Sequence, residues 1–221
     1  MQSRLSKSQI DRLGDELRRT ASKELPLDVA GLDAYRRAFD VASEKLATQL
    51  GSHELGKFTQ RTKSTPSILA KLKRQPNTRL SQIQDVLGIR FVVPDWQEQE
   101  HLCSALKAIF REYKVIDRRT NPSFGYRAIH FMVRVDSKPV EIQIRTVFQH
   151  LWSELSEDFA DKEGHDLKYG GGDKRLLAFL EELSDNVHAR ELELLHSGLR
   201  LRTEQIEAEF KALLPKDAEN N

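Results

Sequence analysis

The segment Val140–Thr146 constrains the fold more than any other part of the chain, because apolar and polar residues alternate along it. Alternation with a period of two is typical of a β-strand that has one face in the core. The apolar residues share that face, and the opposite face carries Glu141, Gln143 and Arg145. This polar face is either an ordinary solvated sheet surface or part of a functional site.

The segments around this strand predict an α/β or α+β fold. Ile129–Val135 is a second strand, and the short polar link 136–139 predicts a hairpin between the two. Further strands are predicted at 88–93 and 113–117, with a helix at 97–111 between them. The strands do not follow a regular βαβ repeat, so we expect a mixed, largely antiparallel sheet flanked by helices.

Helical periodicity dominates the remaining segments and predicts helices at 5–17, 32–50, 147–159 and 176–214. An interruption of the last helix near Ser197-Gly198 is left open. Ser64-Thr65-Pro66 predicts the N-cap and first turn of another helix, which runs to about Lys73. We expect a single domain, 1–221, with a C-terminal helical extension at about 174–214.

Composition narrows the class of protein. Lys and Arg number 35 and Asp and Glu 34, a net charge of +1, so any basic site must be local. The single cysteine, Cys103, excludes an internal disulfide framework and a multi-cysteine metal site, and we expect it in the core. The N-terminus has no apolar signal region, and no apolar run reaches the ~20 residues of a membrane helix, so we expect a cytoplasmic protein.

A basic stretch is the first candidate for a binding site. No acidic residue occurs between Leu55 and Gln84, and the basic residues there are Lys57, Arg61, Lys63, Lys71, Lys73, Arg74 and Arg79. Positive charge beside a helix N-terminus favours a phosphate site, because the helix dipole and the cations act together. A solvated helix face is the alternative explanation of such a run.

Two carboxylates form the second candidate. Asp85 lies just before the predicted strand 88–93, and Glu141 lies on the polar face of 140–146. A carboxylate pair that meets across neighbouring strands can hold Mg²⁺, which prefers oxygen ligands and triphosphates.

The third candidate is a loop that ends in a strand. Gly125 permits a tight turn, after which Tyr126 can stand exposed for a nucleobase to stack on it. Arg127 and His130 follow closely as candidates for phosphate or base contacts. A turn with a core tyrosine is the alternative.

The order and spacing of these candidates resemble the synthetase domain of the RelA/SpoT family over roughly residues 30–160, a nucleotidyltransferase-like fold. The matching motifs are Arg61-x-Lys63-x3-Ser67-x3-Lys71-x2-Arg74, Asp85-x2-Gly88-Ile89-Arg90, Gly125-Tyr126-Arg127-Ala128-Ile129-His130 and Glu141-Ile142-Gln143-Ile144-Arg145-Thr146. The last of these is the most specific. The chain resembles a small, stand-alone alarmone synthetase, which transfers the β,γ-pyrophosphate of ATP to the 3′-hydroxyl of GDP or GTP and so makes (p)ppGpp.

The resemblance also implies a role for each matching residue. Asp85 and Glu141 would be the catalytic carboxylates. Asp85 would bind Mg²⁺, and Glu141 would help to hold the metal or accept the proton of the attacking hydroxyl. The implied ATP-binding residues are Arg61, Lys63, Ser67, Lys71, Arg74 and Arg90, with Arg61 and Arg90 on either side of the adenine. The implied acceptor-binding residues are Tyr126, Arg127, His130, Gln143, Arg145 and His150.

Two departures from the family pattern lie on the acceptor side, at the approach Asn121-Pro122-Ser123-Phe124 and at His150. They leave open a toxic relative that pyrophosphorylates the 3′ end of tRNA or makes adenosine alarmones. A cognate antitoxin protein and a homo-oligomer also stay open as partners. An alternative from another class of function is an inactive nucleotide-binding or interaction module. In that case the long C-terminal helix could bind a partner protein or a second copy of the chain.

Overall fold

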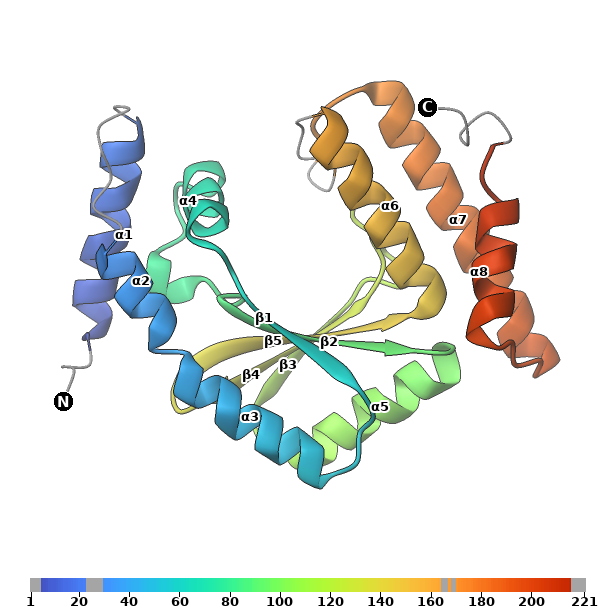
Figure 1. Ribbon diagram of the computed structural model, residues 1–221, viewed down its shortest axis with the longest axis horizontal. Coiled ribbons are helices and arrows are strands. Elements are labelled where there is room, and N and C mark those ends of the chain that lie inside the picture. Colours follow the sequence, from blue (N-terminus) through green and yellow to red (C-terminus); the bar gives the residue numbers. More distant parts are fainter. Residues whose placement is uncertain (1–4, 23–29, 164–166, 168–169, 216–221) are drawn as a thin grey trace. The chain divides into compact units, whose positions relative to one another are not determined.

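The structure is a computed structural model that describes residues 5–22, 30–163, 167 and 170–215. Its elements in chain order are α1 (Lys7–Ser22), α2 (Ala30–Arg37), α3 (Asp40–Ser52), β1 (Phe58–Thr62), α4 (Thr65–Arg74), η1 (Leu80–Gln82), β2 (Leu87–Val93), α5 (Trp96–Ile109), β3 (Tyr113–Asp117), β4 (Ile129–Val135), β5 (Lys138–Thr146), α6 (Val147–Glu163), α7 (Lys174–Ser197) and α8 (Thr203–Ala212). Figure 1 labels them along the ribbon.

Five strands form one mostly antiparallel sheet in the order β1-β2-β5-β4-β3, which confirms the predicted fold class. The β4–β5 hairpin is confirmed as well. Its turn residues Asp136 and Ser137 have φ angles of 49° and 64°, the left-handed backbone that a tight hairpin turn requires. The alternation along β5 is also confirmed, because Val140 and the next two apolar residues are fully buried whereas Glu141 and Gln143 are half-buried.

The described chain divides into two compact units. Unit 1 comprises residues 1–89 and 132–142, and unit 2 comprises residues 90–131 and 143–221. Their boundaries fall within β2, β4 and β5. The predicted single domain stays a prediction.

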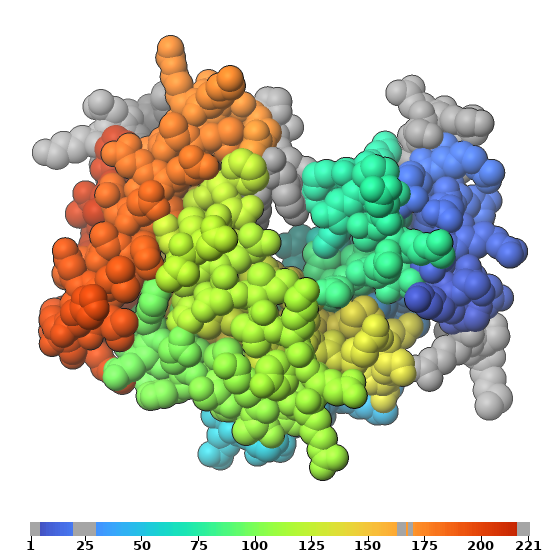
Figure 2. Space-filling view, turned by 180° about the vertical axis from the view of Figure 1, so that it is seen from behind, coloured from blue at the N-terminus to red at the C-terminus, as the bar shows by residue number. Residues whose placement is uncertain are grey.

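In unit 1, α4 begins as the sequence predicts. The Ser64 side chain accepts a hydrogen bond from the Ser67 backbone N–H, and a proline stands in the first turn. Helix α1 packs against α4 and η1, and in Figure 2 the blue and teal segments lie side by side. The Arg18 guanidinium fixes this packing, because it donates to the carbonyl oxygens of Leu72 (3.1 Å) and Thr78 (2.6 Å).

In unit 2, helices α6, α7 and α8 pack on one another around an apolar cluster (Figure 1). Phe148, Trp152 and Leu180 are among its buried members. Helix α7 ends at Gly198, whose φ of 69° is the left-handed C-cap conformation. The interruption left open by the sequence near Ser197-Gly198 is therefore present.

Candidate functional site

Asp85 lies between two lysine ammonium groups. Lys63 Nζ is 2.9 Å from one carboxylate oxygen, and Lys71 Nζ is 2.8 Å from the other. Each of the three side chains is only about 20% exposed. Burial raises the pKa of Asp85, but the charges of Lys71 and Lys63 outweigh it, so the pKa lies below its ordinary value. Asp85 is therefore an anion paired with two cations, and the cluster of three side chains keeps a net positive charge.

Three elements of unit 1 bring this cluster together. Lys63 follows β1 and its backbone N–H donates to the carbonyl oxygen of Val86 at 2.8 Å, which fixes it beside the start of β2. Lys71 comes from α4, whose last turn also contains Arg74. Ser67 lies in the first turn of α4, where its hydroxyl is 2.8 Å from that of Ser64. The predicted phosphate-binding residues thus share one short helix and the strand end before it, an arrangement suited to a polyanion.

Glu141 and Arg61 lie on the two strands that flank β2, and Arg90 lies on β2 itself. A Cβ atom on Gly88 would come within 3.7 Å of the Arg61 carbonyl oxygen and 4.0 Å of the Glu141 carbonyl oxygen. Arg61 and Glu141 therefore lie beside Gly88 on the two neighbouring strands, and Gly88 is three positions after Asp85 in the sequence.

The carboxylates of unit 1 fit a magnesium ion by their chemistry. Among the residues that the structure describes, no three His, Cys, Asp or Glu side chains gather as a metal site. Mg²⁺, however, is commonly bound by one or two carboxylates together with substrate phosphates, and Asp85 and Glu141 can supply such a pair.

Arg145, in unit 2, is a buried cation. It is 2% exposed, and its Nη2 donates to Tyr126 Oη at 3.2 Å and to Gln143 Oε1 at 3.1 Å. Its guanidinium carbon lies 5.2 Å from the Tyr126 ring centroid, and His130 packs against that ring with 5.5 Å between centroids. Within the described chain, no acid pairs with Arg145, and its Nε and Nη1 have no hydrogen-bond partner. A buried arginine with spare donors favours an anionic ligand.

His150 lies on α6 and its Nε2 is 3.3 Å from a Glu154 carboxylate oxygen. Burial lowers the pKa of His150, and the charges of Arg145 and Arg90 lower it further, against the opposing effect of Glu154. The imidazole is therefore favoured in its neutral form near pH 7.

Arg127 is bound by the protein itself. It is 5% exposed and donates to Ser184 Oγ (2.9 Å), to Asp185 Oδ1 (2.6 Å) and to the carbonyl oxygen of Arg119. The predicted contact between Arg127 and an acceptor stays a prediction, and it would have to compete with these bonds.

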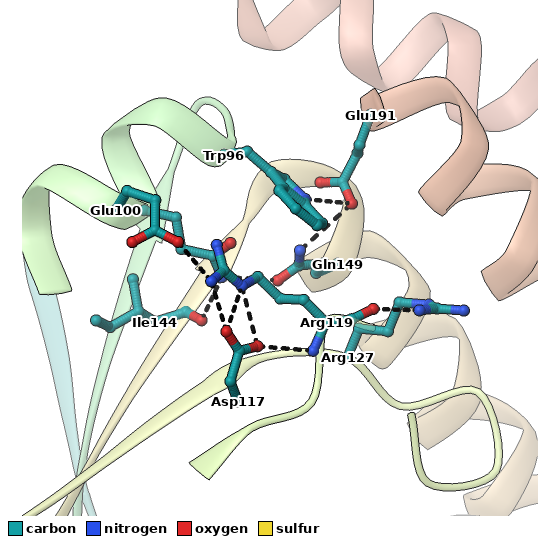
Figure 3. Close-up of polar contacts among 9 residues, drawn as sticks. Trp96, Glu100, Asp117, Arg119, Arg127, Ile144, Gln149 and Glu191 are labelled. Carbon is teal, nitrogen blue, oxygen red and sulfur yellow. Dashed lines mark hydrogen bonds and ion pairs between the residues drawn. The ribbon is translucent and has the colours of Figure 1, made fainter. Parts of the chain in front are cut away.

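A polar network that the sequence did not predict continues from Arg119 (Figure 3). Arg119 forms ion pairs with Asp117 and Glu100, both at 2.5 Å, and its guanidinium carbon lies 4.7 Å from the Trp96 ring centroid. Trp96 Nε1 donates to the Glu191 carboxylate at 3.1 Å. The network therefore connects the strand β3 to helices α5 and α7.

Glu191 connects this network to the end of β5. Its carboxylate accepts hydrogen bonds from the Thr146 hydroxyl and from Gln149 Nε2, the latter at 3.3 Å. Gln149 also accepts from Gln99 Nε2 at 2.9 Å. Burial raises the pKa of Glu191 to about 6, although these hydrogen bonds oppose the rise. In the sequence, Glu191 is one acid among many on a charged helix, and no local signal distinguishes it.

Residues 60–166 match the family model described as the region found in RelA/SpoT proteins. A protein of Mycobacterium tuberculosis, described as uncharacterized, is 37% identical over 123 residues, which cover 54% of this chain and 45% of that protein. The match thus spans about half the length of the mycobacterial relatives. The GTP pyrophosphokinase YwaC of Bacillus subtilis is 27% identical over 173 residues, which cover 71% of this chain and 80% of YwaC.

Among solved structures, the small alarmone synthetase 2 of Bacillus subtilis has the same fold. It superposes with a TM-score of 0.62 at 23% identity, covering 74% of this chain and 96% of that one. No helix within the described residues has the length and apolar character needed to cross a membrane.

Proposed function

Residues 60–166 form a domain of the RelA/SpoT family, and from this premise we propose that the chain is an ATP-dependent pyrophosphokinase that acts on the 3′-hydroxyl of GDP or GTP. The observation that carries the proposal is the placement of Asp85 between Lys63 and Lys71. This cluster couples a carboxylate suited to a metal with two cations suited to a triphosphate.

In the donor half, Lys63, Lys71, Arg74 and Ser67 bind the ATP phosphates. Arg61 and Arg90 enclose the adenine, because planar guanidinium groups stack on a base as ammonium groups cannot. Asp85 and Glu141 would hold Mg²⁺, which would neutralise charge on the phosphates.

The reaction is an in-line displacement at the β-phosphorus of ATP. The 3′-oxygen of the acceptor forms a bond to that phosphorus, the bond from the phosphorus to the oxygen bridging the α- and β-phosphates breaks, and AMP leaves. Glu141 accepts the proton of the attacking hydroxyl. Positioning and charge neutralisation by the side chains supply most of the lowering of the barrier.

In the acceptor half, Tyr126 provides the ring on which the guanine stacks. Arg145 lies against that ring and, with its spare donors, attracts the acceptor phosphates. Gln143, His130 and His150 add polar contacts. The near-zero net charge favours a free nucleotide over tRNA as acceptor, because a long polyanion is usually bound by a broad basic surface.

The donor assignment predicts that Arg61→Ala and Lys63→Ala weaken ATP binding by about tenfold or more, since each removes a charge or stacking contact to ATP. The measurement is ATP affinity by calorimetry in the absence of any acceptor. Lys57→Ala is the matched control, because it removes an exposed charge from the same basic stretch. Unchanged ATP affinity in the first two variants would mean that the stretch is only a solvated face.

The acceptor assignment predicts labelled guanosine tetra- or pentaphosphate when γ-labelled ATP is incubated with GDP or GTP. Separate incubations contain ADP, ATP or bulk tRNA. Labelled tRNA without labelled guanosine product would overturn the choice of acceptor and leave the pyrophosphate transfer standing. The salt dependence checks the result independently, since a tRNA reaction falls steeply with salt and a nucleotide reaction only slightly.

Tyr126→Ala is expected to raise the KM for the acceptor about tenfold or more and to leave the KM for ATP unchanged, because base stacking contributes ~1–3 kcal/mol. Tyr126→Phe is the matched control. It keeps the ring and removes only the hydroxyl that accepts from Arg145. Equal acceptor KM values in the Ala variant and the parent would contradict the stacking role.

A further inference from the structure

The loop that carries Tyr126 is bonded to helix α7 through one serine hydroxyl. Ser184 is 2% exposed, and its Oγ donates to the carbonyl oxygen of Gly125 at 2.5 Å. The same hydroxyl oxygen of Ser184 accepts from Arg127 Nε at 2.9 Å. The hydroxyl thus both donates to the residue before Tyr126 and accepts from the residue after it, so its orientation is fixed.

A second contact lies one helical turn earlier on α7. Trp152 Nε1 donates to the carbonyl oxygen of Leu180 at 2.8 Å. A Cβ atom on Gly125 would lie 2.6 Å from Cζ2 of this tryptophan and 3.0 Å from the Leu180 oxygen. The backbone of the loop therefore rests directly on α7. In Figure 2 the orange helix borders the yellow-green part of the chain that contains the loop.

The loop itself is a short closed turn. Ser123 and Tyr126 exchange backbone hydrogen bonds of 3.2 and 3.0 Å, and Gly125 has a φ of 80°. Because these two hydrogen bonds close the turn, its attachment at Gly125 and Arg127 constrains the direction of the Tyr126 ring. Helix α7 begins at Lys174, beyond the residues 60–166 that match the family model.

We propose that Ser184 is a positioning residue that clamps the Gly125–Tyr126 turn to α7, and that this C-terminal helix thereby determines how tightly the acceptor binds. The second clause rests on the proposed function. The first does not, because the clamp consists of bonds within the free protein. Arg127 acts in the same clamp, with Asp185 as its charged partner.

The test of the clamp is amide hydrogen exchange in the free protein. Ser184→Ala is expected to speed exchange of the peptide that spans Ser123–Arg127 about tenfold, because the turn loses its bond to α7. Ser197→Ala is the matched control. It removes a hydroxyl from the same helix, where that hydroxyl donates to the Leu194 carbonyl oxygen. Unchanged exchange of the turn in Ser184→Ala would overturn the clamp.

The test of the acceptor effect is steady-state kinetics. Ser184→Ala is expected to raise the KM for the acceptor about tenfold and leave the KM for ATP within about twofold. A rise in both KM values, or a fall in kcat alone, would indicate a general structural role and contradict the proposal. If the parent forms no labelled product with any acceptor, the proposed function fails, while the exchange result still decides the clamp.

Asp185→Asn provides a variant that keeps the fold, since this side chain is 72% exposed. It weakens the hold on Arg127 without touching the Ser184 hydroxyl. Exchange of the turn is expected to rise about twofold, less than in Ser184→Ala, because exposed ion pairs contribute little. Exchange that is slower than in the parent would count against the clamp.

Discussion

Asp85→Asn and Glu141→Gln are each expected to lower product formation on the order of 10³-fold or more, because each removes a negative charge that faces the metal and the phosphates. The measurement is the initial rate with saturating ATP and acceptor. Asp40→Asn serves as the control, since it removes an acid of unit 1 from the first turn of α3. A rate near that of the parent in either of the first two variants would contradict the site.

The two carboxylate variants are expected to differ in stability. Asp85 forms ion pairs with two lysines that are each about 20% exposed, so Asp85→Asn leaves two half-buried ammonium groups without their counter-ion. The cost should be about 1–3 kcal/mol of unfolding free energy. Glu141→Gln, which leaves the ion pairs of Asp85 in place, should cost less. Urea unfolding measures both, and a loss in Asp85→Asn no larger than that in Glu141→Gln would contradict the expected contribution of the two ion pairs.

The loss of unfolding free energy in Asp85→Asn depends on pH, and the lowered pKa of Asp85 gives the direction of this dependence. Burial raises the pKa of Asp85, but Lys71 and Lys63 bring it below the ordinary value of 3.8. A carboxyl with a lowered pKa in the folded state stabilises the protein above pH 3.8, and this contribution is lost as pH falls through the folded-state pKa. The stability difference between the parent and Asp85→Asn should therefore persist at about pH 5 and shrink below about pH 4.

The sequence predicts those parts of the fold in which local pattern and burial agree. Strand β5 is one example. Its apolar residues face the core, Glu141 and Gln143 lie on the other face, and the alternation of apolar and polar residues in the sequence reflects this difference. Strand β1 was not predicted, since it lies at the sheet edge and its central residues are exposed, so no apolar alternation is required. The predicted helix 32–50 is in fact two helices, α2 and α3. The sequence did not reveal the break at residues 38 and 39, because the helical spacing of apolar residues continues across it.

The residues of the candidate site also fall into two groups, those that the sequence predicts and those that only a tertiary contact reveals. Lys63, Lys71 and Asp85 were predicted from motif spacing, and the structure brings them together as one ion-paired cluster. Ser184 and Glu191 could not be predicted, because each acts through a partner more than 40 residues away in sequence. A buried serine or acid on a charged helix gives no periodic signal, and only the tertiary contact reveals it.

Gly125→Ala is expected to destabilise unit 2 by about 2–4 kcal/mol and to raise the acceptor KM by at least the factor expected for Ser184→Ala. One cost is conformational, since a φ of 80° is strained for any residue with a Cβ. The other is steric. The new methyl group would lie 2.6 Å from the Trp152 ring and 3.0 Å from the Leu180 oxygen, and that oxygen belongs to helix backbone, which cannot rotate away.

Gly198→Ala separates these two costs. Gly198 also has a left-handed φ, of 69°, but a Cβ added to it would meet no atom of the described chain within 4 Å, so only the conformational cost of about 1 kcal/mol applies. Urea unfolding of both variants gives the steric part as their difference, and the KM for ATP should stay constant in both. Since the steric part exists only where the turn rests on α7, equal losses in the two variants would mean that the turn stands away from the helix, and the acceptor site would then have to be built without it.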